Sequence, residues 1–202
     1  SYAFGDTPPT GLTDQAIEFN PANPSFHNVR VAGANSKART APPKATSYVS
    51  PWGYQSVMTC SDCHASNADA DPRGPHGSTN ARILRGLWTA NTGRSGNVTG
   101  HLCFKCHQAS VYGYGAAESN TDATAFSASA GQKNLHSVHA TKGYGCMDCH
   151  SKVPHGAARA RLIVYRTDPA VYRGGASTRG INSWTANPRS YQESNCSTAG
   201  CH

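Results

Sequence analysis

The sequence predicts a fold that is mostly coil, with short helices and little strand, organised around bound cofactors. Ile, Leu, Val and Phe together make up only 25 of the 202 residues, which is below the share with which chains normally build a hydrophobic core. Twenty glycines and 12 prolines interrupt regular elements. Eight cysteines fall into four pairs, and a histidine follows each pair at once. The cysteine pairs indicate what replaces the missing core.

These four pairs carry the chemistry. Three of them have the spacing Cys-x-x-Cys-His, and the last has a gap of four residues. The sites are Cys60/Cys63/His64, Cys103/Cys106/His107, Cys146/Cys149/His150 and Cys196/Cys201/His202. This spacing is the attachment signature of c-type haem, because two thiols about one helical turn apart can add to the two vinyl groups while the next residue reaches the iron. We therefore predict four covalently bound haem c groups, with the four motif histidines as proximal ligands.

Zinc and disulfides are the alternatives. Two Cys-x-x-Cys pairs would share one zinc ion and would not require a histidine after each pair. A disulfide inside a Cys-x-x-Cys pair would close a strained ring and would leave the histidines unexplained. At the fourth site the alternative is a Cys196–Cys201 disulfide. A haem is favoured there because Gly200 lets the backbone bulge out the two extra residues.

Four porphyrins would supply the core that the side chains lack, at about 50 residues per haem. They also change the charge balance. The formal net charge is +7, and eight haem propionates would bring it to −1 with ferrous irons and +3 with ferric irons. Most of the basic excess is thus expected to be counter-charge. Lys and Arg are scattered along the chain without a basic helix, so nucleic acid is not an expected partner.

Regular elements should be short. Local helical turns should hold the motifs, Ala116 to Gly131 should be a polar loop, Lys133 to Ala140 a helix, and Arg161 to Tyr165 a brief strand or helix. The first cysteines of the motifs recur at intervals of 43, 43 and 50 residues, and outside the motifs little else repeats. We predict one haem-threaded domain over residues 1–202 rather than a solenoid. Residues 1–59 form a haem-free N-terminal arm, which either wraps haem edges or docks another molecule.

No run of 18 apolar residues occurs, so no membrane-spanning segment is predicted. The sequence starts without a basic and then apolar leader. Since c-type haem is attached outside the cytoplasmic membrane, we expect an exported chain from which a signal peptide was removed. The expected location is extracellular or at the cell surface, with the periplasm as the alternative.

Six histidines lie outside the motifs, and four would close every iron. They are His27, His76, His101, His136, His139 and His155. Methionine is scarce, because Met147 lies inside a motif and Met58 is too close to Cys60 to reach the far face of that haem. A haem iron with two histidine ligands has no position for a substrate. We therefore predict electron transfer and no enzymatic activity.

His136 and His139 are three residues apart and share one face of a helix, so they should serve two different haems. His76 follows His64 by 12 residues, a link of about 40 Å when extended, which can pass around a porphyrin and close the same haem.

His155 is only five residues beyond His150, a link of about 17 Å, so a neighbouring haem is its easier target. The predicted distal ligands are thus His76, His136, His139 and His155. For the two histidines in Pro-His-Gly segments, the alternative is a surface turn.

Two histidines remain. His101 is tethered on the proximal side of its own haem, two residues before Cys103, and a surface role is expected. His27 lies in the arm, 33 residues ahead of Cys60. It could bind a haem of its own chain, bind a haem of the next chain, or do neither.

Four Cys-Cys-His sites in about 200 coil-rich residues, a long haem-free start holding His27, and His-x-x-His ahead of the third site resemble the extracellular tetrahaem c-type cytochromes of metal-reducing microbes. Members of that family polymerise into filaments, the cytochrome nanowires. The resemblance implies a stacked haem chain that continues from subunit to subunit, with His27 as the ligand that closes an iron in the neighbouring copy.

The expected partners are copies of the same chain, and beyond them other redox proteins or extracellular acceptors. Two alternatives stay open. A periplasmic tetrahaem shuttle would use the same haems without polymerising, and a multihaem reductase would need one open iron.

Overall fold

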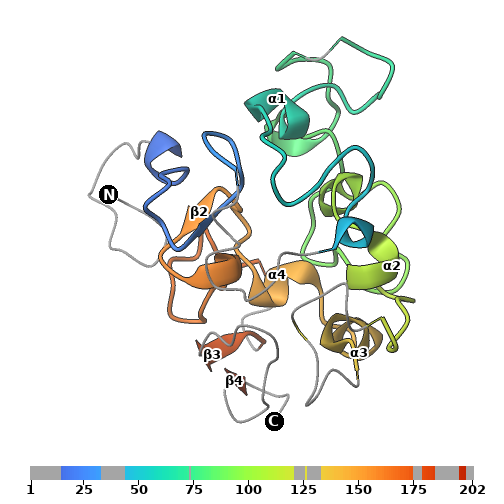
Figure 1. Ribbon diagram of the computed structural model, residues 1–202, viewed down its shortest axis with the longest axis vertical. Coiled ribbons are helices and arrows are strands. Elements are labelled where there is room, and N and C mark those ends of the chain that lie inside the picture. Colours follow the sequence, from blue (N-terminus) through green and yellow to red (C-terminus); the bar gives the residue numbers. More distant parts are fainter. Residues whose placement is uncertain are drawn as a thin grey trace.

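The computed structural model describes residues 15–32, 44–72, 74–120, 126, 133–174 and 179–184, together with the backbone of 196–198. This part of the chain is mostly coil with short helices and little strand, which confirms the predicted fold class at that level (Figure 1). The helices are α1 (Cys60–Cys63), α2 (Ala109–Tyr112), α3 (Leu135–Thr141) and α4 (Cys146–Cys149). Single 3₁₀ turns lie at Gln15–Ile17, Ala45–Ser47, Ala81–Ile83, Leu102–Lys105 and Ala160–Leu162.

Two small antiparallel sheets join segments that are distant in sequence. Strand β1 (Ser25–Phe26) pairs with β2 (Gly156–Ala157), with Ser25 opposite Ala157. Strand β3 (Ile181–Trp184) pairs with β4 (Cys196–Thr198). The first sheet fixes the described part of the N-terminal arm against the chain that follows α4.

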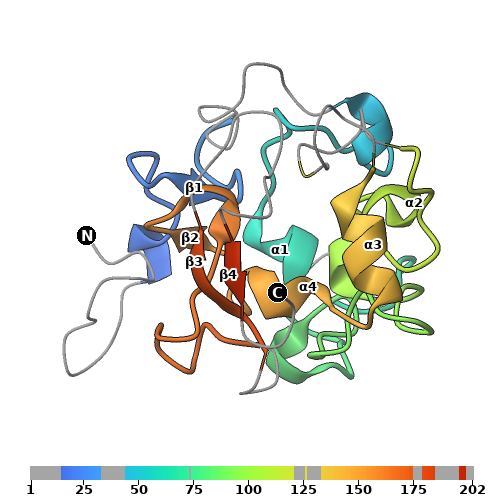
Figure 2. The ribbon, with the colours of Figure 1, turned by 90° about the horizontal axis from the view of Figure 1, so that it is seen from below.

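Helix α4 lies between the β1–β2 sheet on one side and helices α2 and α3 on the other, in both views (Figures 1 and 2). Helix α3 is held to the α2 region by side chains at its start. The amide of Asn134 donates to the carbonyl of Val111 at 2.7 Å, while its oxygen caps the helix by accepting from the N–H of His136 at 3.0 Å. The hydroxyl of Ser137 donates to the carbonyl of Ala116 at 2.6 Å.

The local predictions can be compared with these elements. The predicted helix at Lys133 to Ala140 is present as α3, shifted slightly toward the C-terminus. The segment predicted as a brief strand or helix at Arg161 to Tyr165 is a 3₁₀ turn followed by isolated bridges from Ile163 to His150 and from Tyr165 to Ile181. Of the predicted polar loop at Ala116 to Gly131, residues 116–120 and 126 are described, and the rest lies outside the described residues.

The side-chain core is small, as the composition predicts. One cluster of buried apolar residues consists of Ala157, Leu162, Val164 and Tyr172, with Val153 packed against it. Over all the described residues, buried polar side chains are as numerous as buried apolar ones. Within the same residues, no helix has the length and apolar character needed to cross a bilayer.

Candidate haem sites

The first and third motifs are single helical turns with the same N-terminal cap. In α1 the carboxylate of Asp62 accepts from the N–H of Thr59 at 2.7 Å, and in α4 the carboxylate of Asp148 accepts from the N–H of Gly145 at 2.7 Å. Both aspartates are buried. A Cys-x-Asp-Cys sequence thus caps its own turn, since the residue between the cysteines satisfies a free N–H group at the start of the helix.

Each of the three described motifs fixes its histidine in the same way. The N–H of the histidine donates to the carbonyl of the first cysteine, at 2.8 Å for His64, 2.9 Å for His107 and 2.9 Å for His150. In the second motif Cys103 lies within the 3₁₀ turn Leu102–Lys105, and Cys106 directly follows it. The helical turns predicted for these motifs are therefore present, and each histidine follows its two thiols on a compact turn.

Three pairs of histidine rings face each other in the described residues, and each pair joins one motif histidine to one histidine from outside the motifs. The ring centroids are 6.4 Å apart for His64 and His155, 6.3 Å for His107 and His27, and 6.4 Å for His150 and His136. No motif histidine shares a partner with another.

The separation within these pairs has a physical meaning. A bond from a metal to an imidazole nitrogen is about 2 Å long, and the ring centroid lies about 1.1 Å further out, so two imidazoles on opposite sides of one iron would have centroids about 6.2 Å apart. The three measured separations agree with this value. The residues of the first three sites therefore fit a haem iron with two axial histidines.

In several of these histidines Nδ1 is already hydrogen-bonded, which leaves Nε2 to bind metal. Nδ1 of His64 contacts the carbonyl of Arg82 at 2.8 Å, and Nδ1 of His150 contacts the carbonyl of Arg161 at 2.8 Å. Nδ1 of His27 contacts the carbonyl of Pro154.

Nδ1 is also hydrogen-bonded in His155 and in His139, which lies outside the three pairs. Nδ1 of His139 contacts the carbonyl of Leu135 at 2.7 Å, and Nδ1 of His155 contacts the carboxylate of Glu18 at 2.9 Å. Because each of these oxygens accepts a hydrogen bond from Nδ1–H, the proton stays on Nδ1 and Nε2 is left with the lone pair that a metal ligand needs.

The first and third sites belong to a repeated unit that the sequence analysis missed. The segment Pro75-His76-Gly77-Ser-Thr-Asn-Ala81-Arg82-Ile83-Leu84 aligns without gaps with Pro154-His155-Gly156-Ala-Ala-Arg-Ala160-Arg161-Leu162-Ile163. The expectation that little repeats outside the motifs is therefore wrong. The link from motif to Pro-His-Gly is 12 residues in one unit and five in the other, and this difference hides the repeat from a search at fixed period.

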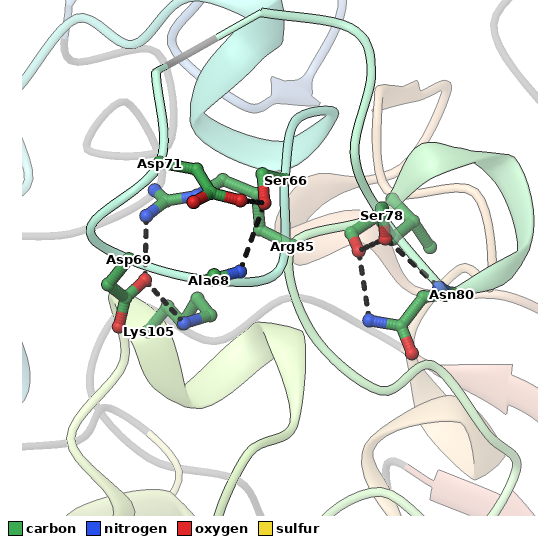
Figure 3. Close-up of polar contacts among 9 residues, drawn as sticks. Ser66, Ala68, Asp69, Asp71, Ser78, Asn80, Arg85 and Lys105 are labelled. Atoms are coloured by element: carbon green, nitrogen blue, oxygen red, sulfur yellow. Dashed lines mark hydrogen bonds and ion pairs between the residues drawn. The ribbon is translucent and has the colours of Figure 1, made fainter.

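The backbone of the two units is also alike. Arg82 and Arg161 have φ of 59° and 60°, and Ile83 and Leu162, which follow them, have φ of 54° and 56°. This left-handed pair of residues turns the arginine carbonyl toward Nδ1 of the motif histidine. In the first unit, the hydroxyl of Ser78 and the amide of Asn80 both donate to the carbonyl of Leu84 (Figure 3), which holds the turn in place.

The remaining histidines lie elsewhere. His76 is exposed, and among the described residues no histidine ring faces it, so the structure brings His155 rather than His76 to His64. The expected surface role of His101 is wrong, because its side chain is buried and Nδ1 contacts the hydroxyl of Thr92 at 2.8 Å. His101 is the N-cap residue of the 3₁₀ turn of the second motif, and its ring lies against Thr92, which is itself fully buried.

The fourth site lies mostly outside the described residues. Cys196 is the first residue of β4, of which the backbone alone is described, and Cys201 and His202 are not described. His139, the predicted ligand one helical turn from His136, packs against Phe126 at 5.4 Å between ring centroids and against Tyr144 at 5.8 Å.

Burial shapes the electrostatics of the paired histidines. It lowers the pKa of His107 to about 3 and the pKa of His136 to about 3, with further lowering by the neighbouring histidines. Both imidazoles are therefore neutral near pH 7, as metal ligation requires. Burial likewise raises the pKa of the Cys63 thiol to about 11 and that of the Cys106 thiol to about 12.

Cysteines of different motifs lie next to one another. The thiols of Cys103 and Cys146 are close enough to shift each other's pKa, raising that of Cys103 and lowering that of Cys146, so the second site lies next to the third. Cys63 of the first site is close enough to Cys103 and Cys106 to raise the pKa of both thiols. The second site is thus adjacent to both of the others.

Among the described residues, no group of three or more His, Cys, Asp or Glu side chains converges on a single point where a metal ion could bind. Comparison of the chain with protein-family models, with curated proteins and with solved structures gives no match. The functional assignment therefore depends on the cysteine motifs and the three facing pairs of histidines.

Proposed function

We propose that this chain is an electron-transfer protein that binds four c-type haems, each with two axial histidines. The observation that carries the proposal is the set of three ring pairs, in which a histidine next to two cysteines faces a second histidine 6.3 to 6.4 Å away. Haem iron, when bound, supplies a one-electron ferric–ferrous couple. The chain supplies covalent attachment, both axial ligands and the surroundings that set the potential.

The residues take the following roles in this proposal. The eight motif cysteines hold the porphyrins, and the four motif histidines are proximal ligands. His155 closes the first site, His27 the second and His136 the third. His139 is the ligand proposed for the fourth site, opposite His202, because its Nδ1 is hydrogen-bonded like that of the other ligands.

Electron transfer is favoured over catalysis because the paired histidines would fill both axial positions at the first three sites, which would leave no position for a substrate. The contacts between cysteines of different motifs favour a short path. Cys103 lies near Cys146, and Cys63 lies near Cys106, so the edges of neighbouring porphyrins would be close. These contacts favour a stacked chain in which the second haem lies between the first and the third.

The test is to produce the full chain, with an export signal, in cells that carry haem-attachment machinery. Intact mass under denaturing conditions should show four covalent haems, and spectra should show four low-spin irons that do not bind CO rapidly when reduced. A chain without covalent haem, or one with a Cys103–Cys146 disulfide, would contradict the proposal. Rapid CO binding would instead favour the multihaem reductase.

Polymerisation into an extracellular filament is the finer proposal, and the resemblance to filament-forming cytochromes favours it. In the structure His27 faces His107 of its own chain. Because the four distal ligands assigned above would close every iron within one chain, copies would be joined by surface contacts and not by a shared iron. We propose His76 as one of the contact residues, since it is exposed and holds the position in the first repeated unit that His155 holds in the second.

Electron microscopy of the wild type and of His76→Ala distinguishes filament from shuttle. Filaments in the wild type and discrete monomers in the variant are expected. Discrete monomers of the wild type at high concentration would favour the periplasmic shuttle. Filaments in both would show that the contact between copies does not need His76.

A further inference from the structure

Glu18 is a buried acid in the N-terminal arm, 2% exposed, directly after the 3₁₀ turn Gln15–Ile17. Its two carboxylate oxygens each receive one hydrogen bond. Nδ1–H of His155 donates to Oε2 at 2.9 Å, and the hydroxyl of Tyr172 donates to Oε1 at 2.6 Å. Burial and the hydrogen bond to Glu18 raise the pKa of Tyr172, so this hydroxyl stays a donor.

This contact differs in charge from the Nδ1 contacts of four other histidines. His64, His150, His27 and His139 all direct Nδ1 at a backbone carbonyl oxygen, which is neutral. At the first site the motif histidine, His64, thus has a neutral carbonyl behind it, whereas its partner His155 has a charged carboxylate.

A carboxylate behind a metal-bound histidine makes the imidazole a stronger donor to the metal. Its negative charge also stabilises the more positive ferric state more than the ferrous state, and little water screens it in a buried position. Both effects act in the same direction, toward a lower reduction potential.

We infer that Glu18 is a positioning residue that, through His155, makes the first haem harder to reduce than the second and the third. The inference rests on the proposed function. Because the first site adjoins the second through Cys63 and Cys106, an electron at the first site would move downhill toward the second. Glu18 thus gives the described haem chain a direction.

The alternative is a purely structural role, in which Glu18 only fastens the arm to His155 and Tyr172. Glu18→Gln separates the two, since glutamine keeps the shape and one acceptor oxygen and removes the charge. The measurement is a spectroelectrochemical titration of the full holoprotein, after its haem content has been counted by mass.

With four haems attached, we expect one midpoint potential of the Glu18→Gln variant to rise by about 59 mV or more, which is a tenfold change in a one-electron equilibrium. The other three midpoints should stay in place, and one of the four ferric EPR signals should change. Glu18→Asp should return most of the shift. Asp168→Asn is the matched control, since Asp168 is also buried but contacts Arg159 and the backbone of Tyr165 rather than a histidine.

Four unchanged midpoints in Glu18→Gln would overturn the inference and leave the proposed function intact. If that variant loses haem or fails to fold, Tyr172→Phe gives the second measurement. It keeps the carboxylate and removes its competing donor, so the same midpoint should fall. A rise or no change there would also overturn the inference. A wild-type chain without covalent haem would contradict the proposed function itself.

Discussion

The rings of His64 and His155 face each other at 6.4 Å, although the two residues belong to different copies of the repeated unit. The second unit therefore supplies the partner for the motif histidine of the first. This exchange connects the two copies more firmly than their limited side-chain core would, because one bound iron would hold both.

The exchange predicts which substitution opens the first iron. His155→Ala should leave four covalent haems and create one five-coordinate iron that binds CO when reduced, because the chain then offers one axial ligand there. His76→Ala is the matched control, from the same Pro-His-Gly context, and should leave the spectrum of the monomer unchanged. CO binding after the His76 change alone would show that His76, not His155, closes the first site.

His27→Ala should likewise open one iron, at the second site, and should do so in dilute monomer. The reason is that His27 faces His107 within the same chain. CO titration at several protein concentrations checks this. If His27 bound a neighbouring copy instead, wild-type monomers would already show an open iron on dilution.

Ile83 and Leu162 occupy matching left-handed positions but have different surroundings. Ile83 is 40% exposed, while Leu162 is 8% exposed and packs in the core cluster. Ile83→Gly should stabilise the protein by up to about 1 kcal/mol, because it relieves a conformation that β-branched residues avoid. Leu162→Gly should destabilise it by about 3 kcal/mol or more through lost packing. Thermal unfolding of the two variants gives the comparison, and equal losses would contradict it.

Asp69 connects the first site to the second by ion pairs, to Arg85 at 2.8 Å and to Lys105 at 3.0 Å (Figure 3). The hydrogen bond and charge of Lys105, with those of Arg85, lower the pKa of Asp69. Its stabilising contribution is therefore complete above the unfolded pKa of about 3.9 and is lost as the pH falls through the lower folded value.

Since the Asp69 side chain is 72% exposed, solvent screening limits the effect. Asp69→Asn should cost less than about 1 kcal/mol at pH 7. The difference from wild type should vanish in 1 M NaCl, where the Debye length is about 3 Å. Thermal midpoints at low and high salt test this, and a loss that survives in high salt would indicate a role other than charge.

The local structure of the sites follows from short-range chemistry, and the sequence predicts it well. Cysteine spacing requires a helical turn, and the aspartate within Cys-x-Asp-Cys caps that turn. The partners of the motif histidines are less predictable. The length of the link allows His76 to reach the haem of His64, but chain length takes no account of contacts with the N-terminal arm.

Contacts with the N-terminal arm hold His155 in its position. Glu18 contacts its ring and β1 pairs with the strand that follows it, and neither residue type nor spacing in the arm forms a pattern that a search along the sequence would detect. The repeat of Pro-His-Gly-x-x-x-Ala-Arg was detectable, and it would have shown His76 and His155 to be equivalent in sequence. It would not have shown which of them lies against His64, since that depends on the pairing of β2 with β1.

His27 and His155 are also neighbours across the β1–β2 pairing, where the N–H of His27 donates to the carbonyl of His155 at 3.0 Å and Nδ1 of His27 contacts the carbonyl of Pro154. Yet their rings face motif histidines of two different sites. One short stretch of paired backbone would therefore set two axial ligands of the proposed haems at the same time. Neither site could close before the segment around His27 meets the much later segment around His155, so the first two irons should acquire their final ligands in a single step.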